Sequence, residues 1–121
     1  MRMVDTFPIL SASEVREIAE RLRVGLQDVF PGESMEIIVY GSYARGEAAP
    51  GSDLDIMVLV DASREEIAAR GWDVSGVSSE LSISCGVTVS PLVENRTFFQ
   101  SLLPILPFFQ NVMREGIRLD E

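Results

Sequence analysis

The sequence has no histidine and no lysine among its 121 residues, and it has a single cysteine, Cys85. Without histidine, a Ser-His-Asp triad, a histidine general base and histidine-ligated zinc are all excluded. Without lysine, Schiff-base chemistry and the phosphate-binding lysine of a P-loop are excluded as well. One cysteine can form neither an intrachain disulfide nor a cysteine-rich metal site, which suits a reducing cytoplasm. Any metal ion must therefore be held by oxygen ligands.

Positive charge is also scarce, because ten arginines face nineteen carboxylates and give a formal net charge of −9. This balance argues against non-specific binding to nucleic-acid backbones, but it leaves room for a local nucleotide site. Residues 1–10 lack the long apolar run of a signal peptide. The longest uncharged run, residues 97–113, is interrupted by two prolines, whereas a membrane helix needs about 20 predominantly apolar residues. We expect a soluble, cytoplasmic protein that does not enter a membrane.

The hydrophobic pattern predicts one domain over residues 1–121 in which helices and strands alternate. A capping box, Ser11 to Glu14, opens an amphipathic helix that ends at a Pro-Gly pair. Apolar, β-branched segments predict three strands, and two longer stretches predict helices, the first with a break near Gly71. The strands are residues 35–40, 54–60 and 87–93. The helical stretches are residues 63–84 and residues 96–113, the latter forming one or two short helices divided by the prolines. The fold class is α/β (α+β): a small mixed sheet of three or slightly more strands with helices packed on it.

Aromatic residues are few, and most of them are expected in the core. Trp72, beside Gly71, is expected to cover the core rather than to stack on a base. The phenylalanines of residues 97–113 are expected either in the core or on a surface for a protein partner or a second copy, because they exceed what a small core readily covers. Cys85 is expected to pack at a helix end, since nothing near it in sequence would activate a thiol.

Chemically useful side chains are concentrated in residues 40–56. Gly41 permits a tight turn after a strand, and Ser42 stands where a short helix begins. Free backbone N–H groups and the positive end of the helix dipole favour a phosphate at that point. Arg45 either adds a charge-assisted phosphate contact or forms a surface ion pair. Ser52 completes the candidate nucleotide-binding residues, although a local hydrogen bond that holds its loop is the more ordinary role.

Asp53 and Asp55 form a pair of carboxylates on the second predicted strand. Because side chains alternate along a strand, both point to one face, roughly 6–7 Å apart, while Leu54 and Ile56 point into the core. Two such carboxylates repel each other unless a cation lies between them. Mg²⁺ is the natural candidate, because it takes oxygen ligands and leaves positions for phosphates and water. Asp53 and Asp55 are thus the candidate metal ligands and catalytic residues.

These residues resemble the minimal nucleotidyltransferases of the DNA polymerase beta superfamily, in particular its bacterial antitoxin-type branch. The hallmark of that family is Gly-Ser, a spacer of about ten residues and Asp-x-Asp at the head of a strand. Here Gly41-Ser42 is followed by residues 43–52 and by Asp53-Leu54-Asp55. The resemblance extends over the whole chain and implies a nucleotidyltransferase fold, Mg²⁺ on the paired aspartates and Ser42 on the triphosphate. Many bacterial relatives are antitoxins encoded beside a helical toxin, and some modify that toxin with a nucleotide.

The sequence departs from this family at a third carboxylate, which active members usually carry on the following strand. Thr88 or Ser90 stands where that acid would fall. The missing group would serve as a metal ligand or as general base for the incoming hydroxyl, and a neutral hydroxyl supplies neither charge. Glu94 lies beyond the expected point, and Glu80 and Asp61 are substitutes only if the fold brings them to the site.

Two functions therefore follow from the sequence. The first is Mg²⁺-dependent transfer of a nucleoside monophosphate from a triphosphate, ATP before the others, to an acceptor hydroxyl that a partner protein could carry. The second is a catalytically impaired nucleotide-binding module that acts through protein contacts. The intact Gly-Ser and Asp-x-Asp motifs favour the enzyme, whereas the missing acid favours the binding module. The acceptor and the base preference are not encoded in any motif of this chain.

Overall fold

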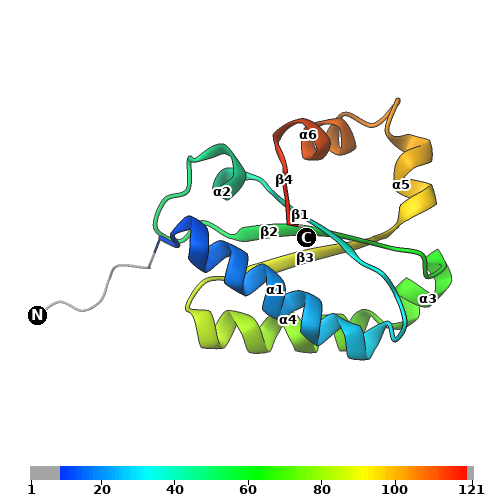
Figure 1. The fold of residues 1–121 in the computed structure, drawn as a ribbon, viewed down its shortest axis with the longest axis horizontal. Coiled ribbons are helices and arrows are strands. Elements are labelled where there is room, and N and C mark those ends of the chain that lie inside the picture. The colour runs from blue at the N-terminus through cyan, green and yellow to red at the C-terminus, as the bar shows by residue number, and fades with distance from the viewer. Residues whose placement is uncertain (1–8, 120–121) are drawn as a thin grey trace, which may run out of the picture.

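The fold is an α/β arrangement of short elements around one sheet, seen in a computed structural model that describes residues 9–119 (Figure 1). Most of the segment 1–10, from which the absence of a signal peptide was inferred, lies outside these residues. Within residues 9–119 there are six helices and four strands. In chain order they are α1 (Ala12–Val29), β1 (Glu36–Tyr40), α2 (Ser42–Arg45), β2 (Leu54–Val60), α3 (Arg64–Ala69), α4 (Gly71–Cys85), β3 (Val89–Asn95), α5 (Arg96–Leu102), α6 (Pro107–Glu115) and β4 (Ile117–Arg118).

The sheet has the strand order β3-β2-β1-β4, with β2 and β1 in its centre. β1 and β2 are antiparallel, and their register pairs Tyr40 with Asp55. β2 and β3 are parallel, and their register pairs Asp55 with Ser90. The mixed sheet expected from the sequence is confirmed. Asp55 therefore has a residue of each neighbouring strand directly beside it.

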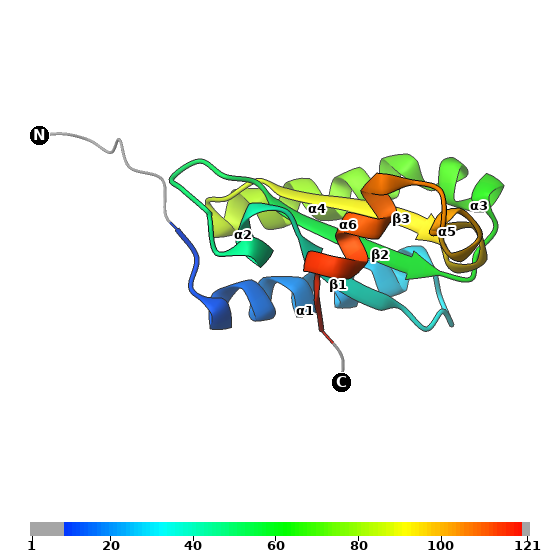
Figure 2. The same ribbon diagram turned by 90° about the horizontal axis from the view of Figure 1, so that it is seen from above.

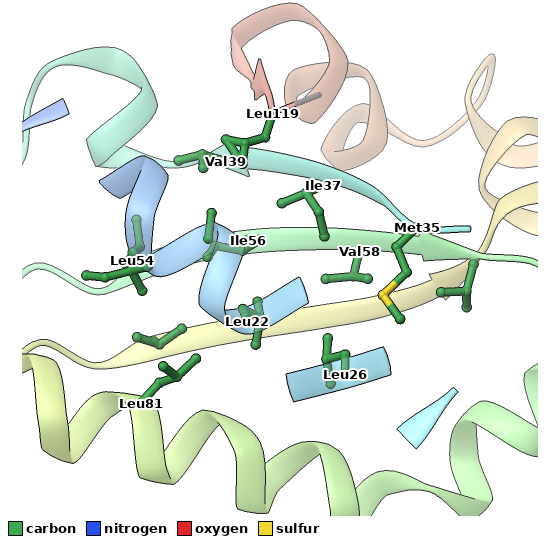
Figure 3. Packing of buried hydrophobic residues seen from close by; sticks show 14 of the residues in the cluster. Leu22, Leu26, Met35, Ile37, Val39, Leu54, Ile56, Val58, Leu81 and Leu119 are labelled. Carbon is green, nitrogen blue, oxygen red and sulfur yellow. The ribbon is translucent and has the colours of Figure 1, made fainter. Parts of the chain in front are cut away.

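Helices cover both faces of the sheet, as the two views show (Figures 1 and 2). On one face, α1 and α4 pack over alternate residues of the strands, and Leu22, Leu26 and Leu81 meet Ile56 and Val58 there (Figure 3). On the other face, α5 and α6 form a smaller cluster over the remaining residues of β1 and β2. Both faces of β2 are covered, which is why its sequence is apolar without alternation.

Several local predictions are confirmed. The side chain of Ser11 accepts a hydrogen bond from the backbone of Glu14, whose own side chain accepts one from the backbone of Ser11, so the capping box starts α1. The break expected near Gly71 separates α3 from α4. Cys85 is a free cysteine and the last residue of α4, partly buried against the core. No helix within residues 9–119 is long and apolar enough to cross a membrane.

The fourth strand falls within the predicted sheet of three or slightly more strands. It is the pair Ile117–Arg118, antiparallel to β1 and too short to carry a sequence signal. Two expectations need correction. Asp53 precedes β2 by one residue instead of lying on it. Trp72 does not cover the core, because it is 90% exposed. A helix with so little separation of polar and apolar residues as α4 gives no pattern from which that orientation could be read.

The phenylalanines of α5 and α6 divide between the two roles that the sequence left open. Phe99 and Phe109 are buried and stacked, with ring centroids 4.5 Å apart. Phe98 is partly buried against the same cluster. Phe108 remains 42% exposed while its ring meets Tyr40 edge to face. Most of this aromatic content is therefore core, and it argues for a partner surface only weakly.

Candidate active site

The carboxylate pair lies at the start of β2, on the face of the sheet that α5 and α6 cover. Leu54 and Ile56 are fully buried on the opposite face, so the alternation of the strand turns Asp55 away from them. Asp53, one residue before the strand, lies close enough for its charge to act on Asp55. Asp53 is exposed and Asp55 is half-buried. Further along the same face of β2 follow Met57 and Leu59, which belong to the apolar cluster. The acids therefore stand at the open end of an otherwise apolar layer.

Gly41 is held directly against Asp55. It follows the last residue of β1, whose antiparallel register places Tyr40 beside Asp55. The backbone of Gly41 has a positive φ of 78°, and a Cβ atom built on it would lie 2.5 Å from Oδ2 of Asp55. Only glycine combines this backbone with this close approach. The Gly-Ser turn and the carboxylate pair, separated by ten residues of sequence, thus form one continuous surface.

The site carries negative charge that nothing in it fully balances. Burial raises the pKa of Asp55, and the neighbouring charge of Asp53 raises it further, while Arg45 opposes the shift. Burial and the charge of Asp55 raise the pKa of Tyr40 to about 12. The phenol is therefore neutral at physiological pH and cannot act as a base there. A cation near both carboxylates would relieve the repulsion, so this pair of oxygen donors fits a divalent metal ion.

Ser42 and Arg45 are the first and last residues of α2, the short helix between the glycine turn and the loop before β2. Ser42 is half-buried. Arg45 forms ion pairs with Glu47, at 2.9 Å, and with Glu115 at the end of α6, at 3.4 Å. Of the two roles that the sequence left open for Arg45, the structure therefore contains the ion pair. The contact with Glu115 also joins α2 to α6 beside the acids.

Ser52 holds the loop that leads into Asp53. Its hydroxyl accepts a hydrogen bond from the backbone N–H of Ala49 at 2.9 Å, and its own N–H donates to the carbonyl of Ala49 at 2.9 Å. This is the local role that the sequence favoured for Ser52. The residue lies next to the acid pair in sequence, so it supports Asp53 through the shape of the loop.

The parallel register decides the question of the third carboxylate. Ser90 is the residue of β3 paired with Asp55. Thr88 precedes β3, and its carbonyl accepts a hydrogen bond from the N–H of Leu54 at 2.8 Å. Glu94 pairs with Leu59, four residues and about 13 Å further along the sheet. Within residues 9–119 no group of three acidic, cysteine or histidine side chains is arranged to hold a metal ion. The third position of the site is therefore a serine.

The other two acids considered as substitutes lie elsewhere. Asp61 follows the far end of β2, where it forms an ion pair with Arg96 at 3.1 Å. Glu80 is on α4, which covers the opposite face of the sheet. Neither carboxylate reaches Asp55. The length of β2 separates Asp61 from it, and the sheet separates Glu80 from it.

Sequence reasoning missed Tyr40, Phe108 and Glu115 as parts of this neighbourhood. The ring of Phe108 lies 5.6 Å from that of Tyr40, and Glu115 contacts Arg45. Tyr40 could have been found from the sequence, because it directly precedes the Gly-Ser turn and because antiparallel pairing of the first two predicted strands would bring it beside Asp55. Phe108 and Glu115 could not, because only the packing of α6 on the sheet brings them to the site.

The sequence of the chain matches the family of the nucleotidyltransferase domain over residues 15–101, and the chain belongs to this family. Two curated relatives come from Methanocaldococcus jannaschii. "Putative protein adenylyltransferase MJ0604" is 29% identical over 91 residues, which are 75% of this chain and 83% of the relative. "Putative protein adenylyltransferase MJ0141" is 23% identical over 90 residues, which are 74% of this chain and 89% of the relative.

Two solved structures have a similar fold. One is the "Crystal structure of the toxin-antitoxin with AMP-PNP", with a TM-score of 0.55, 23% identity, and coverage of 84% of this chain and 72% of that one. The other is a crystal structure of a mutant of the toxin-antitoxin MntA-HpeT, with a TM-score of 0.52, 22% identity, and coverage of 93% and 73%. At these identities the likeness establishes the nucleotidyltransferase fold, as the sequence resemblance had implied.

Proposed function

We propose that this protein binds ATP together with a divalent metal ion, Mg²⁺ foremost, and transfers AMP to a hydroxyl group of a protein. The observation that carries the proposal is the close approach of the Gly41 backbone to Asp55, which supports a phosphate site at this turn beside the carboxylate pair. In the reaction, the acceptor oxygen forms a bond to the α-phosphorus of ATP. The bond from that phosphorus to the oxygen bridging the α- and β-phosphates breaks, pyrophosphate leaves, and the hydroxyl proton passes to solvent.

In this proposal Asp53 and Asp55 hold the metal ion, which supplies charge neutralisation for the triphosphate and for the leaving pyrophosphate. Asp55 is half-buried beside Tyr40 and Gly41, whereas Asp53 is exposed at the end of a loop. In this proposal the half-buried carboxylate and the exposed one hold the ion from the two sides. Reactions of this kind depend mainly on positioning and on the neutralisation of charge, which this pair can supply.

We assign the triphosphate to the Gly41-Ser42 turn. The absence of a side chain at Gly41 allows a phosphate to approach the backbone, and the Ser42 hydroxyl can donate to a phosphate oxygen. Arg45 would exchange its longer contact, with Glu115, for a phosphate oxygen and keep its shorter one with Glu47. Because Glu115 ends α6, this exchange would loosen α6 from α2 when nucleotide binds.

The choice of ATP and of a protein acceptor is supported by the known proteins that resemble this chain. Two curated relatives are named "putative protein adenylyltransferase", and the solved toxin-antitoxin structure with AMP-PNP contains an analogue of ATP. A toxin encoded with this protein is accordingly the first acceptor to test. Cys85, which is a free thiol, is consistent with work in the reducing cytoplasm, where ATP is available.

A second function, nucleotide binding without transfer, is favoured by one observation. Ser90 occupies the position beside Asp55 where a third carboxylate would act, and no other acid reaches that position within residues 9–119. Without a general base, the acceptor hydroxyl must lose its proton to water or enter as an activated group. The protein would then act through its contacts with a partner.

The first experiment measures binding. Calorimetric titration of the protein with ATP should give a clearly higher affinity with Mg²⁺ than with a chelator. Asp53→Asn and Asp55→Asn should each lower the metal-dependent affinity by about tenfold, or about 1.4 kcal/mol. Glu94→Gln is the matched control, because it removes one charge from the same face of the sheet at its far end. Unchanged affinity in both Asn variants would refute the assignment of the metal ligands.

The second experiment separates transfer from binding. The protein is incubated with ATP labelled at the α-phosphate, Mg²⁺ and the co-encoded protein, and label on protein is measured. The enzyme function predicts labelling by the wild type that Asp55→Asn abolishes. The binding function predicts none, and Ser90→Asp should then create slow transfer, because it restores a charge beside Asp55. Thr88→Asp, two residues away, serves as the positional control.

A further inference from the structure

A groove runs between α1 and α4 on the side of the molecule away from the acid pair. Its volume is about 1050 Å³. The two helices pack against each other and share the face of the sheet opposite to α5 and α6 (Figures 1 and 2). The groove is therefore separated from the candidate active site by the sheet, and a molecule bound in it would leave that site open.

The helices forming the groove are antiparallel and closely packed. Arg21, midway along α1, donates a hydrogen bond to the side chain of Ser84, near the end of α4, at 3.1 Å. One turn further along α1, a Cβ atom built on Gly25 would lie 2.7 Å from Cγ1 of Val77, so the Val77 side chain packs against the backbone of α1 where α1 has no side chain. A Cβ atom on Gly76 meets nothing within 4 Å, so the floor of the groove is open there.

Two large apolar side chains at the groove are exposed to solvent and are not covered by any other part of the described fold. Trp72 is 90% exposed and Val24 is 61% exposed, and both line the groove. A tryptophan at the mouth of an open groove is a typical anchor of a protein interface, since it buries a large area at little cost in conformational entropy. It has no role in the nucleotidyltransferase site, because the sheet lies between them.

The rim of the groove is acidic. Four carboxylates and one arginine line it, and the arginine is already bound to α4 through Ser84. The carboxylates are Glu20 and Asp28 on α1 and Asp73 and Glu80 on α4. Within residues 9–119 only Glu20 has an ion-pair partner, Arg23, at 3.1 Å. Three carboxylates beside an exposed tryptophan are thus available to positive charge from another molecule.

We propose that this groove docks a positively charged amphipathic helix of another protein. The apolar face of that helix would cover Trp72, Val24 and the open backbone at Gly76, and its lysines or arginines would meet Asp28, Asp73 and Glu80. A second copy of this chain does not fit, because its net charge is −9 and its own groove would oppose acids with acids. The surface binds independently of nucleotide, so it stands whether or not the proposed function is correct.

The test uses a synthetic amphipathic helix with leucine on one face and lysine on the other, and the same peptide with glutamate in place of lysine. Trp72 is the only tryptophan of the chain, so its fluorescence reports directly from the groove. The lysine peptide should shift the emission to shorter wavelength, and the glutamate peptide should not. In calorimetry, Trp72→Ala should weaken binding of the lysine peptide by about tenfold or more.

A matched pair of charge variants separates the groove from the general attraction of an acidic protein for a cationic peptide. Glu80→Gln should weaken binding several-fold more than Glu65→Gln, which removes the same charge from α3 outside the groove. Equal effects of the two variants, or binding that leaves the Trp72 emission unchanged, would overturn the proposal. So would sedimentation that shows a dimer dissociated by Trp72→Ala, because the groove would then bind a second copy. Circular dichroism checks that each variant is folded.

Discussion

Replacement of Gly41 by alanine tests the contact on which the candidate site depends. Gly41 has φ 78° and ψ −155°, a backbone conformation that is nearly restricted to glycine. An alanine there costs on the order of 1–3 kcal/mol in backbone strain alone. In addition, its Cβ would lie 2.5 Å from Oδ2 and 3.3 Å from Cγ of Asp55, so the carboxylate has to move.

The matched control is Gly46→Ala, at the other end of α2. Gly46 also has a positive φ, of 72°, but a Cβ atom built on it meets nothing within 4 Å. Its replacement costs about 1–2 kcal/mol of backbone strain and displaces nothing. For a chain of this length, each kcal/mol lowers the melting temperature by roughly 3–5 °C. Gly41→Ala should therefore destabilise at least as much as Gly46→Ala, with an additional effect on binding.

Two assays distinguish the variants. Thermal unfolding followed by circular dichroism gives their stability without metal, and calorimetry gives the affinity for ATP with Mg²⁺. Gly41→Ala should lower that affinity by about tenfold or more, because a displaced Asp55 cannot hold the ion with Asp53. Gly46→Ala should leave it within about twofold, a difference of roughly 0.4 kcal/mol. If both variants bind equally well, the close approach of Gly41 to Asp55 has no part in the site.

Further predictions concern stability, pH and the arginine. Gly76→Ala should stabilise the protein by about 0.5–1 kcal/mol in chemical denaturation, because it adds helix propensity in open space, whereas Gly25→Ala should destabilise it by forcing α1 away from α4. The folded pKa of Asp55 is raised above the ordinary value of 3.8, so its ionisation disfavours the metal-free fold and unfolding free energy falls as pH rises through the folded pKa. Asp55→Asn should accordingly raise the melting temperature at neutral pH, and the gain should vanish once the pH falls below both pKa values. Arg45→Gln should weaken ATP binding more than Glu47→Gln does, as measured by calorimetry; the reverse order would remove Arg45 from the phosphate site.

The register of the sheet is the feature of the site that could not be predicted from the sequence. The sequence identified Thr88 and Ser90 as two alternatives for the third position. The pairing of β2 with β3 selects Ser90 as the neighbour of Asp55. Such pairing depends on how α3 and α4, which join these strands, pack on the sheet, and no local pattern specifies it. The same reason explains why Glu94, only four residues further, is too far from the site.

The amino-acid sequence by itself determined the features that depend on near neighbours in the chain. The capping box of α1, the glycine turn at Gly41, the shared face of Asp53 and Asp55 and the burial of Leu54 follow from helix caps, from positive φ and from the two-residue period of a strand. Tertiary structure alone decided which distant side chains meet: Tyr40 with Asp55, Arg45 with Glu115, and Trp72 with solvent instead of the core. Those contacts depend on the packing of α4 and α6 against the sheet, because a side chain far along the chain becomes a neighbour only when burial of the two apolar layers has fixed the helices in place.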